Sequence, residues 1–385
     1  MNKTYKTLII IALMGILSVS TQVFAGNKDR SGQAGAQHLL IDPWARSNGW
    51  GTAGVAEIRG LESIYSNVAG MAFTKKTEFG FSRTQYLVGS GISINSFALA
   101  QSLTKKDKET GRIIKNFGVL GISVFSMGFG DIEITTVPQP EGNMGNFSPN
   151  LLYIGLHYAK SFNKYIHGGV SFKLINESIA DLSSTGFAID AGVQYLSGPY
   201  ENFKIGVTMK NIGLPMRYAG DGYSLRGIVN ATDHELTLEQ RSAQFEMPSL
   251  LTIGISYDFL FWGKEYKTMS KEDRIDEGLT RNDATNRLTL AGSFTANSYS
   301  RDLFALGIEY SLMDIFMIRA GYTIEGGMWN AKTSTTWYAG PCAGVSLGIP
   351  LAKKNKGNQK LILDYAYRFT NKWKGNHYIS LKVAL

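Results

Sequence analysis

Two short glycine-containing stretches have the residue types and spacing of known catalytic or cofactor motifs. Residues 344–348 (Gly-Val-Ser-Leu-Gly) match the Gly-x-Ser-x-Gly nucleophile elbow, and residues 49–54 (Gly-Trp-Gly-Thr-Ala-Gly) match the Gly-x-Gly-x-x-Gly dinucleotide fingerprint. An elbow would expose Ser346 on a strained strand-to-helix turn as an acyl-transfer nucleophile. A fingerprint would bind a pyrophosphate at the start of a helix that follows a strand.

The surroundings of both stretches favour a structural role instead. Ser346 falls inside a predicted strand, and no histidine has a telling spacing to it; the five are His38, His157, His167, His234 and His377. Pro43 and Trp44 precede the fingerprint, and no βαβ unit surrounds it, so its glycines are expected to allow close backbone packing. His157 and His167 are expected to face the lumen on neighbouring strands near the same turn, but no carboxylate has a metal-ligand spacing to them. We therefore predict no catalytic residue, no metal site and no cofactor.

The elements that carry these residues are β-strands with a two-residue rhythm. In residues 250–259 the apolar side chains Leu251, Ile253 and Ile255 alternate with Thr252 and Gly254. Successive side chains of a strand point to opposite faces, so one face is apolar and the other polar. The pattern predicts about fourteen strands, near residues 78–87, 92–101, 116–126, 150–160, 165–175, 186–195, 203–211, 248–260, 287–295, 302–310, 316–325, 338–348, 360–369 and 377–385.

Charged residues recur on the polar face of these strands. They are Lys173, Asp190, Lys204, Asp258, Arg319, Asp364 and Arg368. A soluble sandwich would place its charges on the solvated outer face, whereas a barrel in lipid has an apolar outer belt and a polar lumen. The sequence therefore predicts an all-β fold, a transmembrane antiparallel barrel in the cell outer membrane over residues 77–385. The inner charges would either hold an N-terminal segment by ion pairs or simply solvate the lumen.

The N-terminal residues predict export. Lys3 and Lys6 precede an apolar run that ends in Val-Phe-Ala, so residues 1–25 are interpreted as a signal peptide with cleavage before Gly26. The formal charge of +8 falls to +6 when these two lysines leave, and no basic block remains, so nucleic acid is not an expected partner. Contact with outer-membrane lipid headgroups is expected instead. Cys342 is the single cysteine, which excludes a disulfide framework.

Residues 26–76 lack the two-residue rhythm and are rich in glycine and small residues. We interpret them as an N-terminal plug with one or two short helices, near 61–65, that enters the periplasmic mouth and fills part of the lumen. An even strand count returns both ends of the barrel to the periplasm. The longer connections near 127–149, 212–247 and 326–337 are then extracellular, and a short extra strand is predicted near 132–137. The long, charged connection 261–286 and the short one at 88–91 fit this scheme less well.

The outer connections contain aromatic and methionine side chains that suit protein contacts. The candidate partner-binding residues are Met216, Tyr218, Tyr223, Leu225, Phe245, Met328 and Trp329. Trp337 lies beside them. The competing interpretation is that Trp and Tyr near strand ends are interfacial girdle residues.

Several of these segments resemble the PorV/PorQ family of FadL-like barrels. Residues 42–56 (DPWARSNGWGTAGVA) resemble the family's opening, and residues 64–72 (IYSNVAGMA) resemble a segment shared with FadL-like fatty-acid transporters. The fragments 211–213 (NIG), 247–249 (MPS) and 363–367 (LDYAY) agree. The plug-motif residues that carry the likeness are Arg46, Gly49, Gly51, Asn67 and Gly70.

This resemblance implies a Bacteroidetes-type outer-membrane protein of the type IX secretion system. Members of the family serve as accessory or shuttle barrels that bind the large translocon barrel, the sortase complex and the C-terminal signal domains of exported cargo. The alternative function is a FadL-like transporter of hydrophobic small molecules, which would need an apolar pocket and a lateral gap in the wall. An outer-membrane lipid deacylase, the third possibility, would need a serine beside a histidine.

Overall fold

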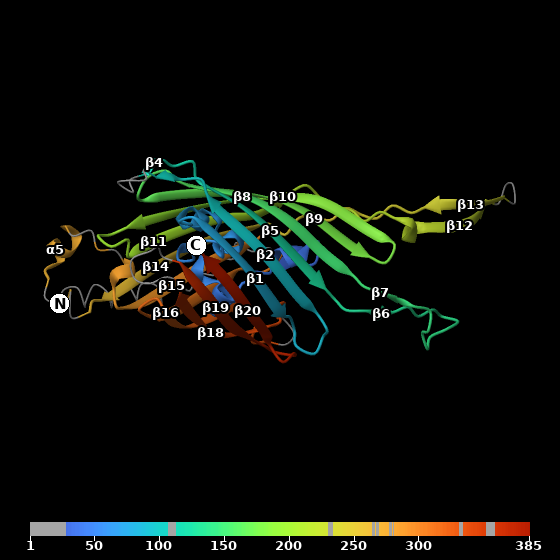
Figure 1. Ribbon diagram of the computed structural model, residues 1–385. Coiled ribbons are helices and arrows are strands. Elements are labelled where there is room, and N and C mark those ends of the chain that lie inside the picture. Colours follow the sequence, from blue (N-terminus) through green and yellow to red (C-terminus); the bar gives the residue numbers. More distant parts are fainter. Residues whose placement is uncertain are drawn as a thin grey trace.

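The computed structural model describes residues 28–106, 113–229, 234–263, 266, 269–276, 279, 281–330, 334–351 and 359–385. Fourteen antiparallel strands form one closed barrel in which chain neighbours pair and β1 pairs with β20 to close it (Figure 1). The strands are β1 (Thr77–Gln85), β2 (Ser93–Ser102), β5 (Val119–Gly128), β8 (Asn150–Ser161), β9 (Ile166–Ile179), β10 (Leu182–Ser197), β11 (Phe203–Gly213), β14 (Leu250–Phe261), β15 (Asn286–Asn297), β16 (Leu303–Leu312), β17 (Phe316–Glu325), β18 (Tyr338–Pro350), β19 (Lys360–Thr370) and β20 (Asn376–Ala384). All fourteen predicted strands are confirmed, with ends shifted by a few residues.

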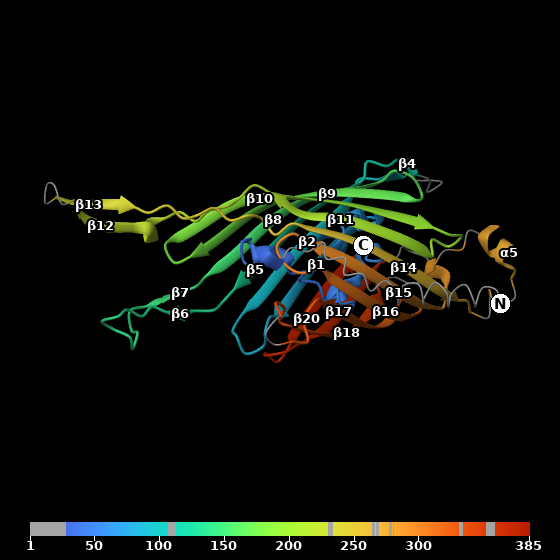
Figure 2. The same cartoon turned by 180° about the vertical axis from the view of Figure 1, so that it is seen from behind.

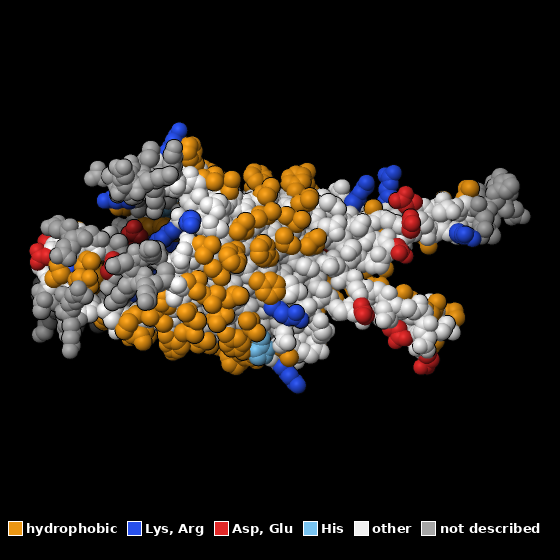
Figure 3. All heavy atoms as spheres, viewed as in Figure 1, with side chains coloured by type: hydrophobic (Ala, Val, Ile, Leu, Met, Phe, Trp, Pro, Cys, Tyr) orange, Lys and Arg blue, Asp and Glu red, His pale blue; other side chains and the backbone are white. Residues whose placement is uncertain are grey.

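Side chains alternate across the wall as the sequence predicts. Leu156, Ile255 and Leu306 face outward and are 59%, 54% and 62% exposed, while Ser171 and Ser256, which also lie on the strands, face inward and are buried. On the face seen in Figure 3, the outward side chains form a broad apolar band across the barrel. Such a surface is stable only against hydrocarbon, because apolar area in water is unfavourable. The chain is an outer-membrane β-barrel. Within the described residues, no helix is both long and apolar enough to cross a membrane.

The connections differ at the two ends of the barrel (Figures 1 and 2). The end that carries Thr77 and Ala384 is the periplasmic, or inner, end under the even-strand rule. It also carries the β3–β4 hairpin (Lys105–Lys106 and Ile113–Lys115), α5 (Lys271–Asp276) and η6 (Arg281–Asp283). Two extensions project from the outer end. They are the pair β6 (Ile132–Glu133) and β7 (Asn146–Phe147), and the hairpin β12 (Ser224–Val229) and β13 (His234–Glu239) that follows η5 (Asp221–Tyr223). The extra strand predicted near 132–137 is thus present as β6.

The N-terminal segment, residues 28–76, runs through the lumen. Its elements are η1 (Lys28–Arg30), η2 (Gln37–Leu40), α2 (Ala45–Gly49), η3 (Ala53–Ala56), α3 (Ser63–Ser66) and η4 (Val68–Phe73). At the outer end Arg30 donates a hydrogen bond to the Tyr299 hydroxyl, at 3.1 Å, and at the inner end the backbone N–H of Leu61 donates to Glu78, at 2.8 Å. The segment therefore lies in the lumen, as expected, but it extends from the inner end as far as the outer mouth, beyond the part of the lumen next to the periplasm.

This path follows from composition, because a segment of small residues can pass close to the inner wall. Whether it blocks passage, as a plug would, stays a prediction. The predicted signal peptide, residues 1–25, and the cleavage site before Gly26 lie outside the described residues.

Candidate functional site

The inner part of the lumen holds a buried ion cluster that joins three parts of the chain. Lys204 of β11 contacts Glu57 of the N-terminal segment and Asp258 of β14, the latter at 2.6 Å. Arg281, from the connection between β14 and β15, contacts Glu57 at 2.5 Å and Asp258 at 3.2 Å. Burial alone would raise the pKa of Glu57, but Arg281 and Lys204 hold this pKa well below its ordinary value. Glu57 is therefore a buried anion with two cationic partners.

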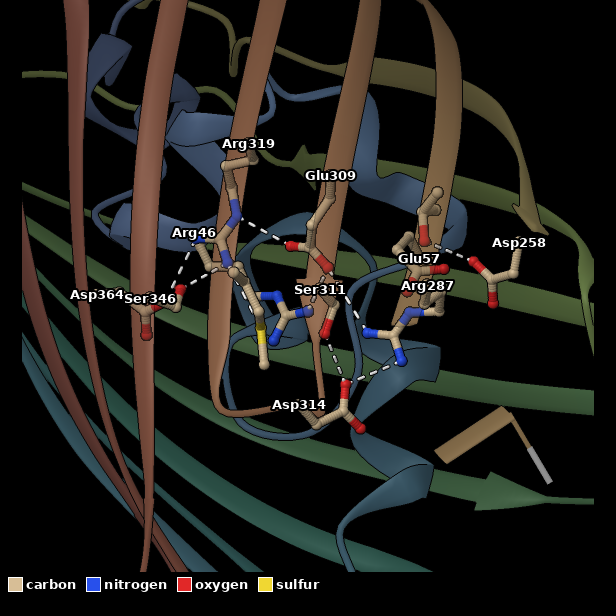
Figure 4. A network of polar contacts seen from close by, with 12 residues as sticks. Arg46, Glu57, Asp258, Arg287, Glu309, Ser311, Asp314, Arg319, Ser346 and Asp364 are labelled. Atoms are coloured by element: carbon tan, nitrogen blue, oxygen red, sulfur yellow. Dashed lines mark hydrogen bonds and ion pairs between the residues drawn. The ribbon is translucent and has the colours of Figure 1, made fainter. Parts of the chain in front are cut away.

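A second cluster lies beside the first (Figure 4). Arg319 donates from Nε to Glu309, at 2.9 Å, and from Nη2 to the Ser346 hydroxyl, at 2.5 Å. Ser346 in turn donates to Asp364, and Arg46 of the N-terminal segment lies 3.4 Å from Glu309. Ser346 is therefore part of a structural network on an extended strand, not the tip of a strand-to-helix turn as an elbow requires.

Of the two expected roles for the inner charges, the structure shows the first: ion pairs join the N-terminal segment to the strands and to Arg281. All seven predicted inner charges are buried. The partners that the sequence interpretation missed are Glu57, Glu62, Arg281, Arg287, Glu309 and Lys382. Glu309 and Lys382 were visible as inward positions of their strands. Glu57 and Glu62 were visible as acids among the apolar and small residues of the N-terminal segment.

The motif residues pack closely, as predicted for glycines without a ligand. A Cβ at Gly70 would lie 2.3 Å from the Ile58 carbonyl oxygen, and Gly51 has φ +63° against Thr323. The Asn67 amide donates to the carbonyl oxygens of Val193 and Val207, which are strand residues. These contacts fix the segment against the wall.

The histidine pair has serine partners. His157 lies between the hydroxyls of Ser123 and Ser171, each at 2.8 Å, and His167 lies 2.7 Å from Ser161. In the described part of the chain, no group of three or more His, Cys, Asp and Glu residues is placed to hold a metal ion.

The outer mouth, in contrast, holds a cavity of about 410 Å³. Its floor comes from the N-terminal segment, through residues 37, 38, 40–42, 48 and 52, and its walls come from the outer ends of the strands and from the connections there. The apolar lining includes Leu40, Ile41, Tyr86, Met127, Phe129, Leu151, Leu303, Met328 and Trp337. Its size and mostly apolar lining are those of a site for a small ligand.

Charged groups line this cavity as well: Arg368 from the wall and Asp42 from the floor. The Arg368 guanidinium lies 3.7 Å from the centre of the Tyr338 ring and donates to Asn48 and Thr323. Burial raises the pKa of Asp42 to about 6, although the backbone N–H of Trp44 donates to it. The cavity is therefore apolar with a polar floor.

The wall beside this cavity has a break in its hydrogen-bond ladder. The register between β17 and β18 ends at Tyr322 and Pro341, so among the described residues Thr323–Glu325 pair only with β16. On the other side of β18, Tyr338 pairs with Thr370 and Cys342 pairs with Arg368 of β19. Four steps along β18 therefore correspond to two steps along β19, so β18 contains a bulge of two extra residues. The bulge contains Gly340, at φ +109°, and Pro341, which has no N–H to donate.

A second hollow, of about 550 Å³, adjoins this break. It shares Met328, Thr335, Thr336 and Trp337 with the first cavity and reaches Ala339 and Lys372. The two hollows therefore meet at one of two irregular parts of the wall described here; the other is the register shift between Ile189 and Ala191 of β10.

The predicted partner-binding residues divide into exposed and buried groups. Leu225 and Trp329 are exposed, at 57% and 72%. Met216 and Met328 are buried, which corrects their expected exposure: Met216 packs over Gly186, and Met328 lines the cavity. Tyr218, Tyr223 and Phe245 are half-buried. Tyr218 donates to Glu177 at 2.6 Å, and its ring centre lies 5.6 Å from that of Phe245. Binding of a partner by these residues stays a prediction.

Comparisons with known proteins add little to this description. No family model matches the chain, and no curated protein matches it. Solved structures with a similar course include the toluene transporter TodX of Pseudomonas putida, with 10% identity, 86% of this chain and 93% of that chain covered, and a TM-score of 0.47. A FadL homologue of Pseudomonas aeruginosa has 10% identity, coverage of 88% and 97%, and a TM-score of 0.45. The monoaromatic hydrocarbon channel CymD has 12% identity, coverage of 89% and 97%, and a TM-score of 0.43. Identities and TM-scores this low support no conclusion about function, and they add nothing to the strand order described above.

Proposed function

We propose that the protein binds hydrophobic small molecules in its outer cavity and passes them sideways through the wall between β17 and β18. The observation that carries this proposal is the ladder break beside two hollows with shared lining residues. A lateral route avoids the inner lumen, where buried charges would oppose an apolar molecule. It also leads directly to the hydrocarbon region, where such a molecule is most stable.

Binding is tested with the purified barrel in detergent, with 1-bromodecane as the probe. Bromine quenches indole fluorescence at close range, and Trp337 lines both hollows. Trp329 also lines the second hollow, so we expect saturable quenching that falls in Trp337→Phe and is lost when Trp329 is replaced as well. Quenching that does not saturate, or that persists in the double variant, would show that the probe lies only in the micelle and would overturn the proposal.

Passage is tested with a bulky side chain at the break. Ala339→Trp should fill the space beside Gly340 and lower uptake of labelled decane by cells that express the barrel, while Trp337 quenching persists. The matched control is Ala343→Trp, which is exposed on the outer face of the same strand. Uptake that is equal in both variants would contradict a route through this part of the wall.

A second candidate function rests on a different observation, the exposed apolar side chains of the projecting hairpin β12–β13. Leu225, Leu236 and Leu238 are 57%, 48% and 54% exposed. The hairpin that carries them projects beyond the barrel (Figure 1). Such side chains suit a protein partner. Together with the family resemblance, they support an accessory role in type IX secretion, with the translocon barrel, sortase complex or cargo signal domains as partners. Affinity capture of these partners that depends on residues 217–241 would support it, and capture that survives replacement of the hairpin by a short linker would not.

A further inference from the structure

The floor of the outer cavity contains two buried hydrogen-bond acceptors without a partner. Asp42 accepts the backbone N–H of Trp44 through Oδ1, at 2.9 Å, but its Oδ2 has no hydrogen-bond partner in the described structure. Neither imidazole nitrogen of His38, Nδ1 or Nε2, has a hydrogen-bond partner there. Both residues line the cavity and are at least nine-tenths buried, at 9% and 2% exposed. Buried polar atoms are nearly always paired, so these unpaired atoms indicate a missing group.

The surroundings of His38 decide which of its nitrogens is an acceptor. Nδ1 lies 3.2 Å from Oε1 of Glu177, while Oε2 of Glu177 accepts the Tyr218 hydroxyl. A carboxylate only accepts hydrogen bonds, so we place the proton on Nδ1, the nitrogen that lies beside Glu177. In the neutral ring, Nε2 then has a lone pair and no hydrogen. Glu177 and Tyr218 thus act as positioning residues for His38.

The cations of the cavity are largely occupied by protein groups. Arg368 donates to Asn48 and Thr323 and stacks on Tyr338. Arg301, on the connection after β15, donates from Nη1 to the Gly326 carbonyl oxygen and keeps an unpaired Nε. The floor therefore offers acceptors, and one donor remains on another side of the cavity.

We infer that the outer cavity takes an apolar molecule with a hydrogen-bond-donating end group, a hydroxyl or an amine, and disfavours a carboxylate. An amine end group would donate to both Asp42 Oδ2 and His38 Nε2, and a hydroxyl, which has one hydrogen, would donate to one of them. The apolar part would lie against Met127, Phe129 and Leu151. A carboxylate would place a second anion beside Asp42 with no proton to share. This inference rests on the proposed ligand binding, and it names the ligand class of the same cavity.

The experiment compares four ligands of equal chain length, namely decane, 1-decanol, decylamine and decanoate. Each competes at neutral pH with 1-bromodecane for quenching of Trp337. The alcohol and the amine should displace the probe at about tenfold lower concentration than decane, because a hydrogen bond to a charged acceptor is among the stronger ones. Decanoate should be no better than decane.

Asp42→Asn is the decisive variant. Its amide can still accept from Trp44 while it presents an N–H to the cavity, so the advantage of decylamine should vanish and decanoate should gain. Asp221→Asn, on the exposed turn before β12, is the matched control and should keep the original order. Normal heat-modifiability on a gel confirms that each variant folds.

The outcomes separate the inference from the function on which it rests. If none of the four ligands displaces the probe, the proposed binding function fails and this inference fails with it. If all four bind equally, or if decanoate binds best to the unaltered protein, the inference is overturned while ligand binding stands.

Discussion

The inner and outer ends of the lumen are both formed by the N-terminal segment and the inward faces of the strands. They differ in whether their buried polar groups have partners. At the inner end Glu57 is enclosed by Lys204 and Arg281, so each buried charge has a partner. At the outer end Asp42 and His38 line the cavity, and Asp42 Oδ2 and His38 Nε2 have no hydrogen-bond partner among the described residues. A paired cluster fixes the segment to the wall, whereas an acceptor without a protein partner beside a cavity is suited to a ligand.

The largest expected effect is at the inner end. Lys204→Met would leave Glu57 and Asp258 with Arg281 as their nearest cation, and breaking a buried ion cluster typically costs about 3–5 kcal/mol. Urea unfolding in detergent micelles measures this free energy. Asp42→Asn, at the outer end, should not destabilise the barrel. Equal losses in the two variants would remove the proposed difference between the ends.

The two ends should also respond to pH in opposite directions. The pKa of Glu57 is lowered in the folded protein, so its stabilising contribution is present above the unfolded value of 4.5 and is lost as pH falls below it. The pKa of Asp42 is raised from 3.8 to about 6, so the folded state binds more protons and its stability decreases as pH rises through this window. That shift corresponds to about 3 kcal/mol, at 1.36 kcal/mol per pKa unit.

Paired unfolding curves isolate the Asp42 contribution. Asp42→Asn should be more stable than the unaltered protein at neutral pH, and the difference should vanish below pH 3.8. A difference that is constant with pH would mean that ionisation of Asp42 is not its cause.

A smaller effect is expected when the cavity is partly filled. Leu151→Phe should weaken binding of 1-bromodecane about tenfold, roughly 1.4 kcal/mol, because the larger ring occupies ligand space. The control is Leu156→Phe, which faces lipid on the same strand. Probe displacement should distinguish them, and identical affinities would place the ligand elsewhere.

The smallest effect is expected on the outer extensions. Leu225→Ser and Trp329→Ser remove exposed side chains, so the free energy of unfolding should change by no more than about 0.5 kcal/mol. Calorimetry in detergent would check this. A clear loss of stability would mean that these side chains pack against the barrel, and would weaken the case for a partner surface.

The sequence by itself determined the wall of the barrel. Each strand repeats an apolar and polar alternation with a period of two, and lipid outside and a filled lumen inside impose the same alternation on every strand. Leu251 and Asp258 could be assigned to opposite faces because that assignment needs only the position of each residue along its own strand. The inward direction of Lys204, Arg319 and Asp364 was predictable for the same reason.

Only the tertiary structure decided what the inward residues meet. Lys204 and Glu57 are 147 positions apart in the chain, and no local pattern relates them. The cavity depends on the space left between the N-terminal segment and the strand ends. Likewise, Met216 and Met328 lie in connections without periodicity, so their burial could not be inferred from spacing. Alternation is a property of a single strand, whereas pairing, cavities and the break beside Pro341 arise from the relative placement of several segments.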